Sequence, residues 1–448
     1  SKKVATCTQP GNEAYYVCTI CSVAFKDEEG TQTTTAEMES IPATGHTEVV
    51  DKRVEPTCTE VGLTEGKHCS VCNGVLVGLE EIPALGHNMT KTEAVEPTYW
   101  AVGNNAYYTC TRCGKVYKDE AGKTETTVEA ETLEKLPGVA SGECGEKLHW
   151  VLTEDGTLTI SGEGKMAYYS ETNTAPWFTK RMKITAVVIE PGVTYIGSYA
   201  FNACLKLASV SLPAGLTTIG SCAFQNCAKL TDVEIPESTE KIYEGAFCGC
   251  SSLEQVIIPK SAYLGSIIIN RYSDKGVFEK CTNLKSVEIQ GGVTFSQNTF
   301  AGCSSLAAVS IPDGMKSIPY GSFSGCSSLT SVIIPENVEI IDEYAFQNCK
   351  SLTEISLPEN VTKIGRSAFS GCSSLISLTI PKNVTSIENN AFSDCGSLKT
   401  ISIPDGVTSI QFSTFSGCKS LTSVTIPEGI IEIGNSAFYG CSSLASVT

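Results

Sequence analysis

The stretch Leu421-Thr-Ser-Val424-Thr-Ile426-Pro427 decides the fold, because it alternates apolar and small polar residues and ends at a proline. In an extended chain Val424 and Ile426 point to one face, and the polar residues between them point to the other. Proline cannot donate a ladder hydrogen bond. The stretch therefore predicts a half-buried β-strand that ends at Pro427.

The same strand pattern returns through the second half of the chain with a fixed period. A phenylalanine recurs every 23 residues, except for one step of 31 and one of 22, and each is followed three residues later by a cysteine and six residues later by a leucine. These are Phe201, Phe224, Phe247, Phe278, Phe300, Phe323, Phe346, Phe369, Phe392, Phe415 and Phe438. Stacked copies of such a unit bury a core that one copy cannot. The period predicts a mainly β solenoid over residues 184–448, with parallel strands and short 3-10 or helical turns.

The full repeat, Ile-Pro-x-x-Val-Thr-x-Ile-Gly-x-x-Ala-Phe-x-x-Cys-x-x-Leu-x-x-Val, resembles the BspA-like, or Treponema pallidum-type, leucine-rich repeat family. The resemblance covers residues 184–448. It implies a secreted or cell-surface bacterial protein that takes part in adhesion to host proteins or to other cells. It implies neither a particular ligand nor any particular binding residue.

The cysteines of the repeat fall on its apolar positions, which indicates small core residues. Cys222 and Cys248 lie off the period, in adjacent repeats and on the same short segment. A disulfide between these two neighbouring coils is one reading, subject to the strict distance that such a bond needs.

The outward strand positions are mostly serine and threonine, without the aromatic or arginine anchors of tight protein interfaces. An acidic patch of Asp232, Glu234 and Glu288 would attract a basic partner, or is simply a solvated acidic face. The 31-residue step adds eight residues that bring Tyr263, Arg271 and Tyr272 together. Insertions of this kind form binding loops in solenoids, but a tolerated insertion that packs on the stack is the alternative.

Residues 1–140 lack the 23-residue period and carry three cysteine modules, which we place at 1–48, 49–90 and 91–140. The first module contains Cys7, Cys18, Cys21 and His46, and the second contains Cys58, Cys69, Cys72 and His87. The third keeps Cys110 and Cys113, but has Tyr99 and Ser141 at the positions of the lone cysteine and the histidine. Alternating stretches in each module predict small β-hairpins.

Three cysteines and one histidine make up a complete tetrahedral zinc set. The joint loss of two ligands in the third module is what a shared site predicts. We therefore expect one closed structural zinc site in each of the first two modules. Disulfides, which would leave one unpaired cysteine per module, and free thiols are the open alternatives.

Residues 141–183 join the modules to the repeats. Asp155-Gly156 between two alternating runs predicts a β-hairpin. Because the first coil of a solenoid would otherwise expose core and strand edges, this segment is expected to cap the array, with Trp150 and Trp177 in the cap core.

The composition restricts the function. An excess of 49 acidic over 32 basic residues, a formal net charge of −17, argues against nucleic acid, and no run of 18 uncharged apolar residues is present for membrane insertion. All four histidines precede the repeats, and no catalytic motif is found, so we expect no enzyme. The sequence favours an extracellular protein that binds a protein or cell-surface ligand. A passive stalk for domains beyond Thr448, where we expect the natural chain to continue, is the alternative.

Overall fold

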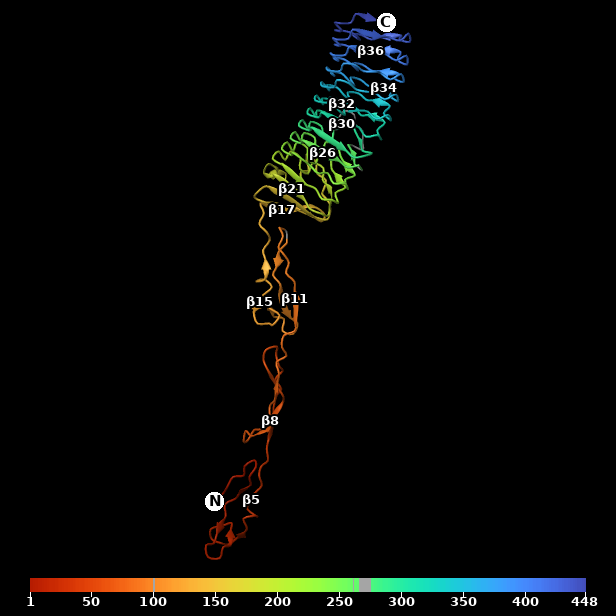
Figure 1. Cartoon of the computed structure of the whole chain (residues 1–448). Helices are drawn as coiled ribbons and strands as arrows, with labels where there is room; N and C mark the ends of the chain where they lie inside the picture. The colour runs from red at the N-terminus through yellow and green to blue at the C-terminus, as the bar shows by residue number, and fades with distance from the viewer. Residues whose placement is uncertain (100, 261, 266–274) are drawn as a thin grey trace. The chain divides into compact units, whose positions relative to one another are not determined.

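The computed structural model describes residues 1–99, 101–260, 262–265 and 275–448. The chain divides into two compact units, residues 1–135 and 136–448, and each has its own architecture (Figure 1). Within the described ranges the one helix is the short 3-10 helix η1 (Phe178–Lys183), and every other regular element is a strand.

Unit 136–448 is a solenoid whose coils contribute strands to two parallel ladders. The first ladder begins with β21 (Ala186–Ile189), which follows Ile184. Its other strands follow the repeat leucine, namely β23 (Ser209–Ser211), β26 (Gln255–Ile258), β28 (Ser286–Ile289), β30 (Ala308–Ser310), β32 (Ser331–Ile333), β36 (Thr400–Ser402), β38 (Ser423–Thr425) and β40 (Ser446–Val447). The second holds β20 (Gly164–Lys165), β22 (Val193–Ile196), β24 (Thr218–Ile219), β25 (Lys241–Ile242), β27 (Tyr263–Leu264), β29 (Thr294–Phe295), β31 (Ser317–Ile318), β33 (Ile340–Ile341), β34 (Lys363–Ile364), β35 (Ser386–Ile387), β37 (Ser409–Ile410) and β39 (Glu432–Ile433).

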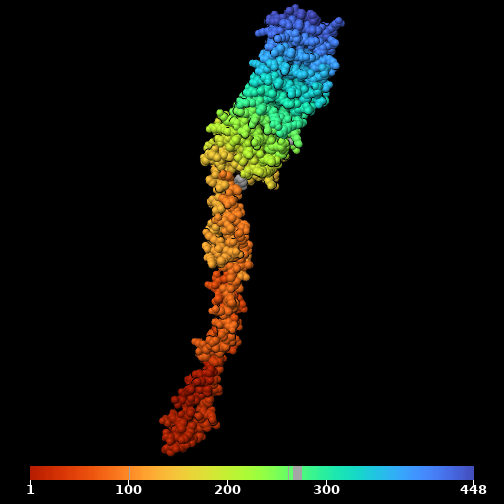
Figure 2. Space-filling view, in the orientation of Figure 1, coloured from red at the N-terminus to blue at the C-terminus, as the bar shows by residue number. Residues whose placement is uncertain are grey.

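Equivalent residues of successive coils lie side by side in these ladders. Val256 of β26 is paired with Val287 of β28, and Ile219 of β24 with Ile242 of β25, in both cases with parallel strands. The coils follow one another as a continuous body in the space-filling view (Figure 2). The predicted parallel-strand solenoid is therefore confirmed.

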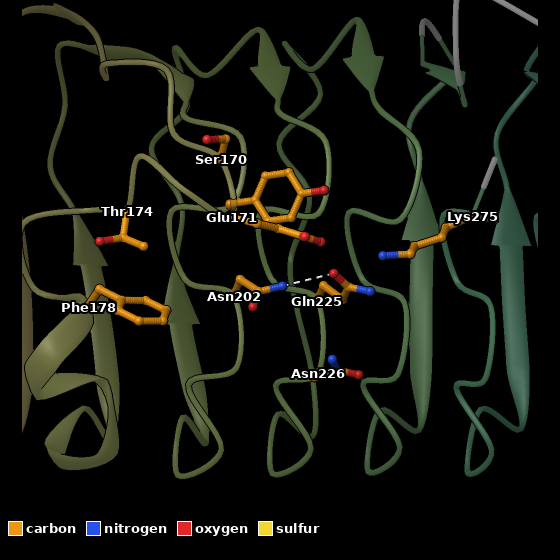
Figure 3. A pocket seen from close by; sticks show the side chains of 9 residues that line it. Ser170, Glu171, Thr174, Phe178, Asn202, Gln225, Asn226 and Lys275 are labelled. Atoms are coloured by element: carbon orange, nitrogen blue, oxygen red, sulfur yellow. Dashed lines mark hydrogen bonds between the residues drawn. The ribbon is translucent and has the colours of Figure 1, made fainter. Parts of the chain in front are cut away.

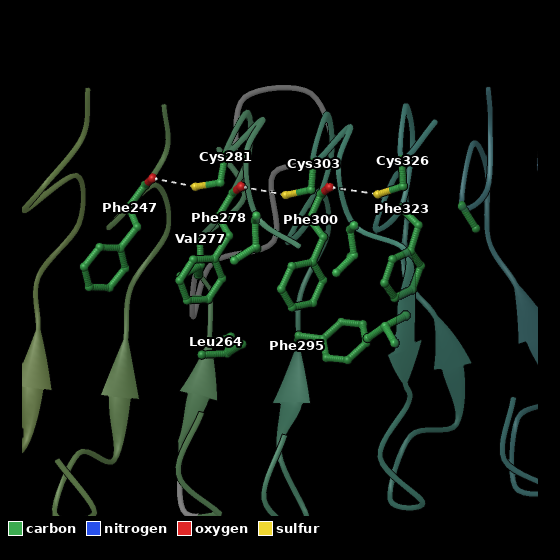
Figure 4. Close-up of a cluster of buried hydrophobic side chains, with 14 of the residues drawn as sticks. Phe247, Leu264, Val277, Phe278, Cys281, Phe295, Phe300, Cys303, Phe323 and Cys326 are labelled. Atoms are coloured by element: carbon green, nitrogen blue, oxygen red, sulfur yellow. Dashed lines mark hydrogen bonds between the residues drawn. The ribbon is translucent and has the colours of Figure 1, made fainter. Parts of the chain in front are cut away.

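The repeat phenylalanines form the centre of this core. The rings from Phe201 to Phe415 are fully buried, and each is stacked on the next, with centroids 5.1 to 5.8 Å apart through Phe438. Figure 4 shows the part of this column from Phe247 to Phe323. Each Ala-Phe-x-x-Cys segment is a single hydrogen-bonded turn, as where Cys227 donates its backbone N–H to the Phe224 carbonyl. The aromatic column gives the coils one shared apolar interior.

The repeat cysteines do more than fill space. Each thiol donates to the carbonyl of the phenylalanine one coil back, at 3.1 to 3.3 Å, in Cys227, Cys250, Cys281, Cys303, Cys326, Cys349, Cys372, Cys395, Cys418 and Cys441. A buried carbonyl without a donor would cost about 1–3 kcal/mol. The cysteine column therefore satisfies backbone groups inside the stack, a role that spacing alone does not reveal.

These thiols are expected to resist alkylation in the folded protein. Burial raises the pKa of Cys326 and of Cys372 to about 12, so both remain protonated, and poor nucleophiles, at pH 8 to 9. Iodoacetamide followed by mass spectrometry should leave both unlabelled until denaturant is added, whereas the exposed Cys21 of a metal-free sample reacts. Rapid labelling of the two repeat thiols under native conditions would contradict the buried column.

Three antiparallel strands cover the first coil. They are β17 (Ala140–Gly145), β18 (Leu148–Leu152) and β19 (Thr157–Gly162), and β19 then pairs in parallel with β21. Trp177 is fully buried, stacks on Phe201 with centroids 5.5 Å apart and donates its indole N–H to the carbonyl of Ala200 at 2.8 Å. Trp177 is thus the first member of the aromatic column.

Unit 1–135 consists of small antiparallel sheets. The strands are β1 (Gly11–Asn12), β2 (Tyr16–Val17), β3 (Ala24–Phe25), β4 (Thr33–Thr34), β5 (Ser40–Ile41), β6 (Glu48–Asp51), β7 (Gly62–Leu63), β8 (Gly66–Cys69), β9 (Val75–Val77), β10 (Glu81–Ile82), β11 (Met89–Thr92), β12 (Gly103–Asn104), β13 (Tyr107–Cys110), β14 (Val116–Tyr117), β15 (Glu125–Thr126) and β16 (Thr132–Leu133). Its described apolar residues include only four that are buried, Cys7, Cys69, Cys110 and Tyr117. The described residues of the unit therefore form almost no hydrophobic core.

Candidate metal centres and binding face

Two clusters of cysteine and histidine lie in unit 1–135. The first joins Cys7, His46, Cys69 and Cys72, and its ligand atoms all lie within 4.8 Å of one another. The Cys7 and Cys69 sulfurs are 3.7 Å apart, and the Cys72 sulfur is 3.6 Å from Nδ1 of His46. Zinc–sulfur bonds of about 2.3 Å in a tetrahedron place two sulfurs about 3.8 Å apart, so this cluster has the dimensions of a zinc site.

The second cluster joins Cys58, His87, Cys110 and Cys113 in the same way. The Cys58 and Cys110 sulfurs are 3.9 Å apart, and the Cys113 sulfur is 3.7 Å from Nδ1 of His87. The other ring nitrogen of His87 lies 3.3 Å from the hydroxyl of Tyr117. A partner on the far nitrogen is what orients a metal-bound histidine.

The strand that follows each histidine pairs with a strand of the next module, and this pairing places the histidine beside the cysteine pair of that module. Residues Glu48 and Cys69 are directly paired between β6 and β8, and the equivalent pair between β11 and β13 is Met89 with Cys110. His46 and His87 each stand two residues before such a pair. The chain before His87 is also fixed to the lone cysteine, because Gly86 donates its N–H to the carbonyl of Cys58 at 3.0 Å.

Each cysteine pair sits on a tight turn. Cys69 exchanges backbone hydrogen bonds with Asn73 and Gly74, and Asn73 adopts a left-handed conformation with φ of 54°. The backbone N–H of Cys72 lowers the pKa of Cys69 to about 5, which favours the thiolate that a metal needs. Burial and the neighbouring Cys69 and Cys72 thiols raise the pKa of Cys7 to about 11, so the set carries less negative charge in the absence of a cation.

The clusters in the structure differ from the ligand grouping predicted from the sequence. Each set forms between two modules, not within one, so Cys18 and Cys21 belong to neither cluster, whereas Cys110 and Cys113 complete the second. The reason is the strand pairing after the histidine, which links residues of adjacent modules. In the third module, Cys110 and Cys113 are kept, and they lie beside Cys58 and His87 of the second module. Tyr99 and Ser141 stand where this module would have its own lone cysteine and histidine, and neither position belongs to a cluster, so both could change together.

Cys222 and Cys248 are not joined in the structure, and a disulfide between them stays a prediction. The register between the two coils does not place Cys222 and Cys248 side by side. Cys222 donates its backbone N–H to Glu244, and Asn226 donates to the carbonyl of Cys248, so the neighbour of Cys248 lies several residues beyond Cys222.

The outward face of the first ladder is the candidate binding face. Asp232, Glu234 and Glu288 are all exposed on it, and a role of this acidic patch in binding stays a prediction. Lys285 forms an ion pair with Glu254 at 2.9 Å in the hollow that Asp232 also lines. A wider hollow of about 700 Å³ crosses β32 and the two following coils. Its lining includes Ser331, Ile333, Glu354, Ser356, Ser377 and Thr379, and Ile333 is 73% exposed.

The predicted insertion loop is only partly described. Tyr263 belongs to β27, is half-buried and pairs with Lys241 and Thr294 in the second ladder, so it is part of the stack and not of a loop. Arg271 and Tyr272 lie outside the described residues. The contribution of these two side chains to binding stays a prediction.

A third hollow, of about 320 Å³, lies beside the cap and was not predicted from the sequence (Figure 3). It is lined by Ser170, Glu171, Thr174, Phe178, Tyr199, Asn202, Gln225, Asn226 and Lys275. Asn202 donates its side-chain N–H to the amide oxygen of Gln225 at 2.8 Å. Its residues come from different coils, which is why no local motif signals it.

Over the parts of the chain that the structure describes, we find no helix with the length and apolar character that a membrane crossing needs.

Comparison with known proteins assigns the repeat region. A family model described as BspA type leucine rich repeat region matches residues 175–273, 271–399 and 387–448, together more than half of the chain. Similar solved structures include a leucine-rich repeat protein from Eubacterium ventriosum, with 27% identity, 68% of this chain and 96% of that chain covered and a TM-score of 0.43. A leucine rich cell surface protein from Faecalibacterium prausnitzii is 26% identical, and the match covers 69% of this chain and 95% of that chain with a TM-score of 0.45. The T. pallidum leucine rich repeat protein is 25% identical, and the match covers 50% of this chain and 91% of that chain with a TM-score of 0.35. No curated protein sequence matches the chain significantly. On the match of the family model, the chain belongs to the BspA-type leucine-rich repeat family.

Proposed function

We propose that this chain is an extracellular bacterial protein of adhesion type, which binds other proteins or cells through the outward face of its first ladder. The observation that carries the proposal is the hollow around Ile333, an exposed isoleucine in a face of serine, threonine and glutamate. Exposed apolar groups with a polar surround are typical of interaction sites. The family membership supports a binding role, and a passive stalk remains the competing function.

Replacing Ile333 by glutamate is expected to weaken ligand capture about tenfold or more, as for an interface residue worth at least 1.4 kcal/mol. Capture is measured by pull-down from panels of host matrix and bacterial surface proteins. Ile431→Glu is the matched control, because Ile431 is 86% exposed and lies just before a second-ladder strand. Equal capture by both variants contradicts the proposed face, and no capture by the wild type favours the stalk.

Removing residues 267–274 restores the 23-residue step between Phe247 and Phe278 and tests the insertion separately. This deletion spares Tyr263 and the rest of β27. If the added residues bind the ligand, the deletion lowers capture while Ile431→Glu does not. Unchanged capture eliminates the insertion as a binding element.

We also propose that Cys7, His46, Cys69 and Cys72 hold one structural zinc ion, and Cys58, His87, Cys110 and Cys113 a second. The match between the cluster dimensions and a tetrahedral Cys3His site supports this assignment. The shortage of buried apolar residues among those described in unit 1–135 also supports it, because small units with little core need a metal or disulfides for stability. All four positions are protein ligands, so the sites are closed and structural, not catalytic.

A further inference from the structure

A third cysteine pair, Cys18 and Cys21, has the same backbone turn as the two pairs in the clusters. Cys18 donates its N–H to the carbonyl of Val23 and accepts from the N–H of Ser22, as Cys69 does with Gly74 and Asn73. Ser22 adopts the left-handed conformation with φ of 61°, close to the 54° of Asn73. The turn of a ligand pair is thus formed at Cys18 and Cys21.

Among the described residues, no lone cysteine and histidine stand opposite this pair. The two such halves in unit 1–135 are Cys7 with His46 and Cys58 with His87, and both already face another pair. Cys18 is only half-buried, whereas Cys69 and Cys110 at the same position of the turn are fully buried; the second cysteine of each pair, Cys21, Cys72 or Cys113, is exposed in all three. The pair therefore has the shape of half a site.

Strand β2, which leads into Cys18 and Cys21, has an unpaired edge among the described residues. β8 and β13 each pair on one side with the strand that follows a histidine of the preceding module, β6 and β11. β2 has β3 on one side and lies at the edge of its sheet on the other. Tyr16 and Val17 of β2 are about half exposed, at 49% and 54%, and Ile20 in the turn is 95% exposed. An exposed edge with apolar side chains is a place where another strand adds.

We infer that Cys18, Cys21 and the open edge of β2 form a docking half-site for another module of this kind. The incoming module adds the strand that follows its histidine along β2 and supplies a cysteine thiolate and an imidazole, which complete a third zinc site. The partner's chemistry is fixed by the two complete clusters, where the same strand and the same two ligands arrive together. This inference rests on the proposed zinc sites, and its test separates the two.

The test lengthens the full chain at its amino end with a second copy of residues 1–51. The length of the copy follows from the offset between equivalent cysteines, since Cys7 and Cys58 are 51 positions apart. The added Cys7 and His46 then reach the original Cys18 and Cys21 with the native spacing. Elemental analysis after dialysis is expected to give two zinc ions in the parent chain and three in the lengthened chain.

The matched control carries Cys7→Ser and His46→Ala in the added copy alone and is expected to return to two zinc ions. Alkylation gives a readout without metal analysis. In the zinc-loaded parent, iodoacetamide should modify Cys18 and Cys21 before all other cysteines, and in the lengthened chain the original pair becomes protected.

The outcomes are distinguishable. Two zinc ions in both parent and lengthened chain, with the original pair still reactive, would overturn the half-site and leave the two proposed zinc sites standing. A parent that holds no zinc would overturn those sites and the inference with them. A zinc-dependent dimer of the parent that is lost in Cys18→Ser would overturn the inferred partner. In such a dimer the Cys18 and Cys21 thiolates of two chains would share one zinc ion, with no imidazole from another module.

Discussion

Removing the two proposed zinc ions is expected to unfold residues 1–135 and to leave the repeat array folded. Of the four buried apolar residues among those described in this unit, Cys7, Cys69 and Cys110 belong to the clusters, so they leave little apolar burial to hold the modules together. Structural zinc contributes about 10–16 kcal/mol of apparent binding free energy in small zinc domains. Residues 136–448 depend instead on the buried aromatic and aliphatic column.

Limited proteolysis with mass spectrometry measures this effect. After chelation, cleavage sites should appear throughout residues 1–135, while a fragment that begins near residue 136 persists. Circular dichroism should show loss of part of the β signal, and added zinc should restore it. Equal protease resistance with and without metal would contradict a stabilising role for zinc.

Single substitutions decide between the two ligand groupings. Cys69→Ser is expected to lower the zinc content from two ions to one, and Cys110→Ser to remove the other, because these thiols belong to separate clusters. Cys18→Ser is the matched control and should leave two. Zinc loss in Cys18→Ser, with none in Cys110→Ser, would restore the grouping within modules. Oxidised cysteines without zinc would favour the disulfide alternative.

The repeat fold was accessible from the sequence because its signal is local and periodic. Valine and isoleucine two residues apart predict a strand, and a phenylalanine every 23 residues predicts that equivalent side chains meet in successive coils. Both predictions depend on apolar burial alone. The hydrogen bond from Cys227 to the carbonyl of Phe201 was not accessible, because the period places the sulfur in the core without specifying an acceptor.

The composition of the two cysteine–histidine clusters could be predicted only in part from the sequence. The ligand types could be read from the sequence, but proximity along the chain favours ligands of one module, while strand pairing brings together residues of two. The alternating residues after His46 carry the missing signal, because they predict a strand without stating its partner. For the same reason Tyr263, assigned to an insertion by the spacing, is in fact paired within the ladder.

Replacing Phe346 by alanine is expected to cost about 3–5 kcal/mol, the usual loss for a large aromatic side chain in a packed core. The ring is fully buried and stacks on Phe323 and Phe369, with centroids 5.4 Å away on both sides. Since each coil contacts only its neighbours, the cavity weakens two interfaces in the middle of the array. The array should then unfold in two segments at different denaturant concentrations.

Urea unfolding followed by circular dichroism measures the loss, and hydrogen exchange locates it to the coils on either side of Phe346. Phe412→Ala is the matched control, since Phe412 is 49% exposed and the same substitution there should stay within about 0.5 kcal/mol. If the aromatic column holds the coils together, Phe346→Ala must lower the stability far more than Phe412→Ala does. Equal destabilisation would mean that backbone ladders, and not stacked rings, provide the coupling between coils.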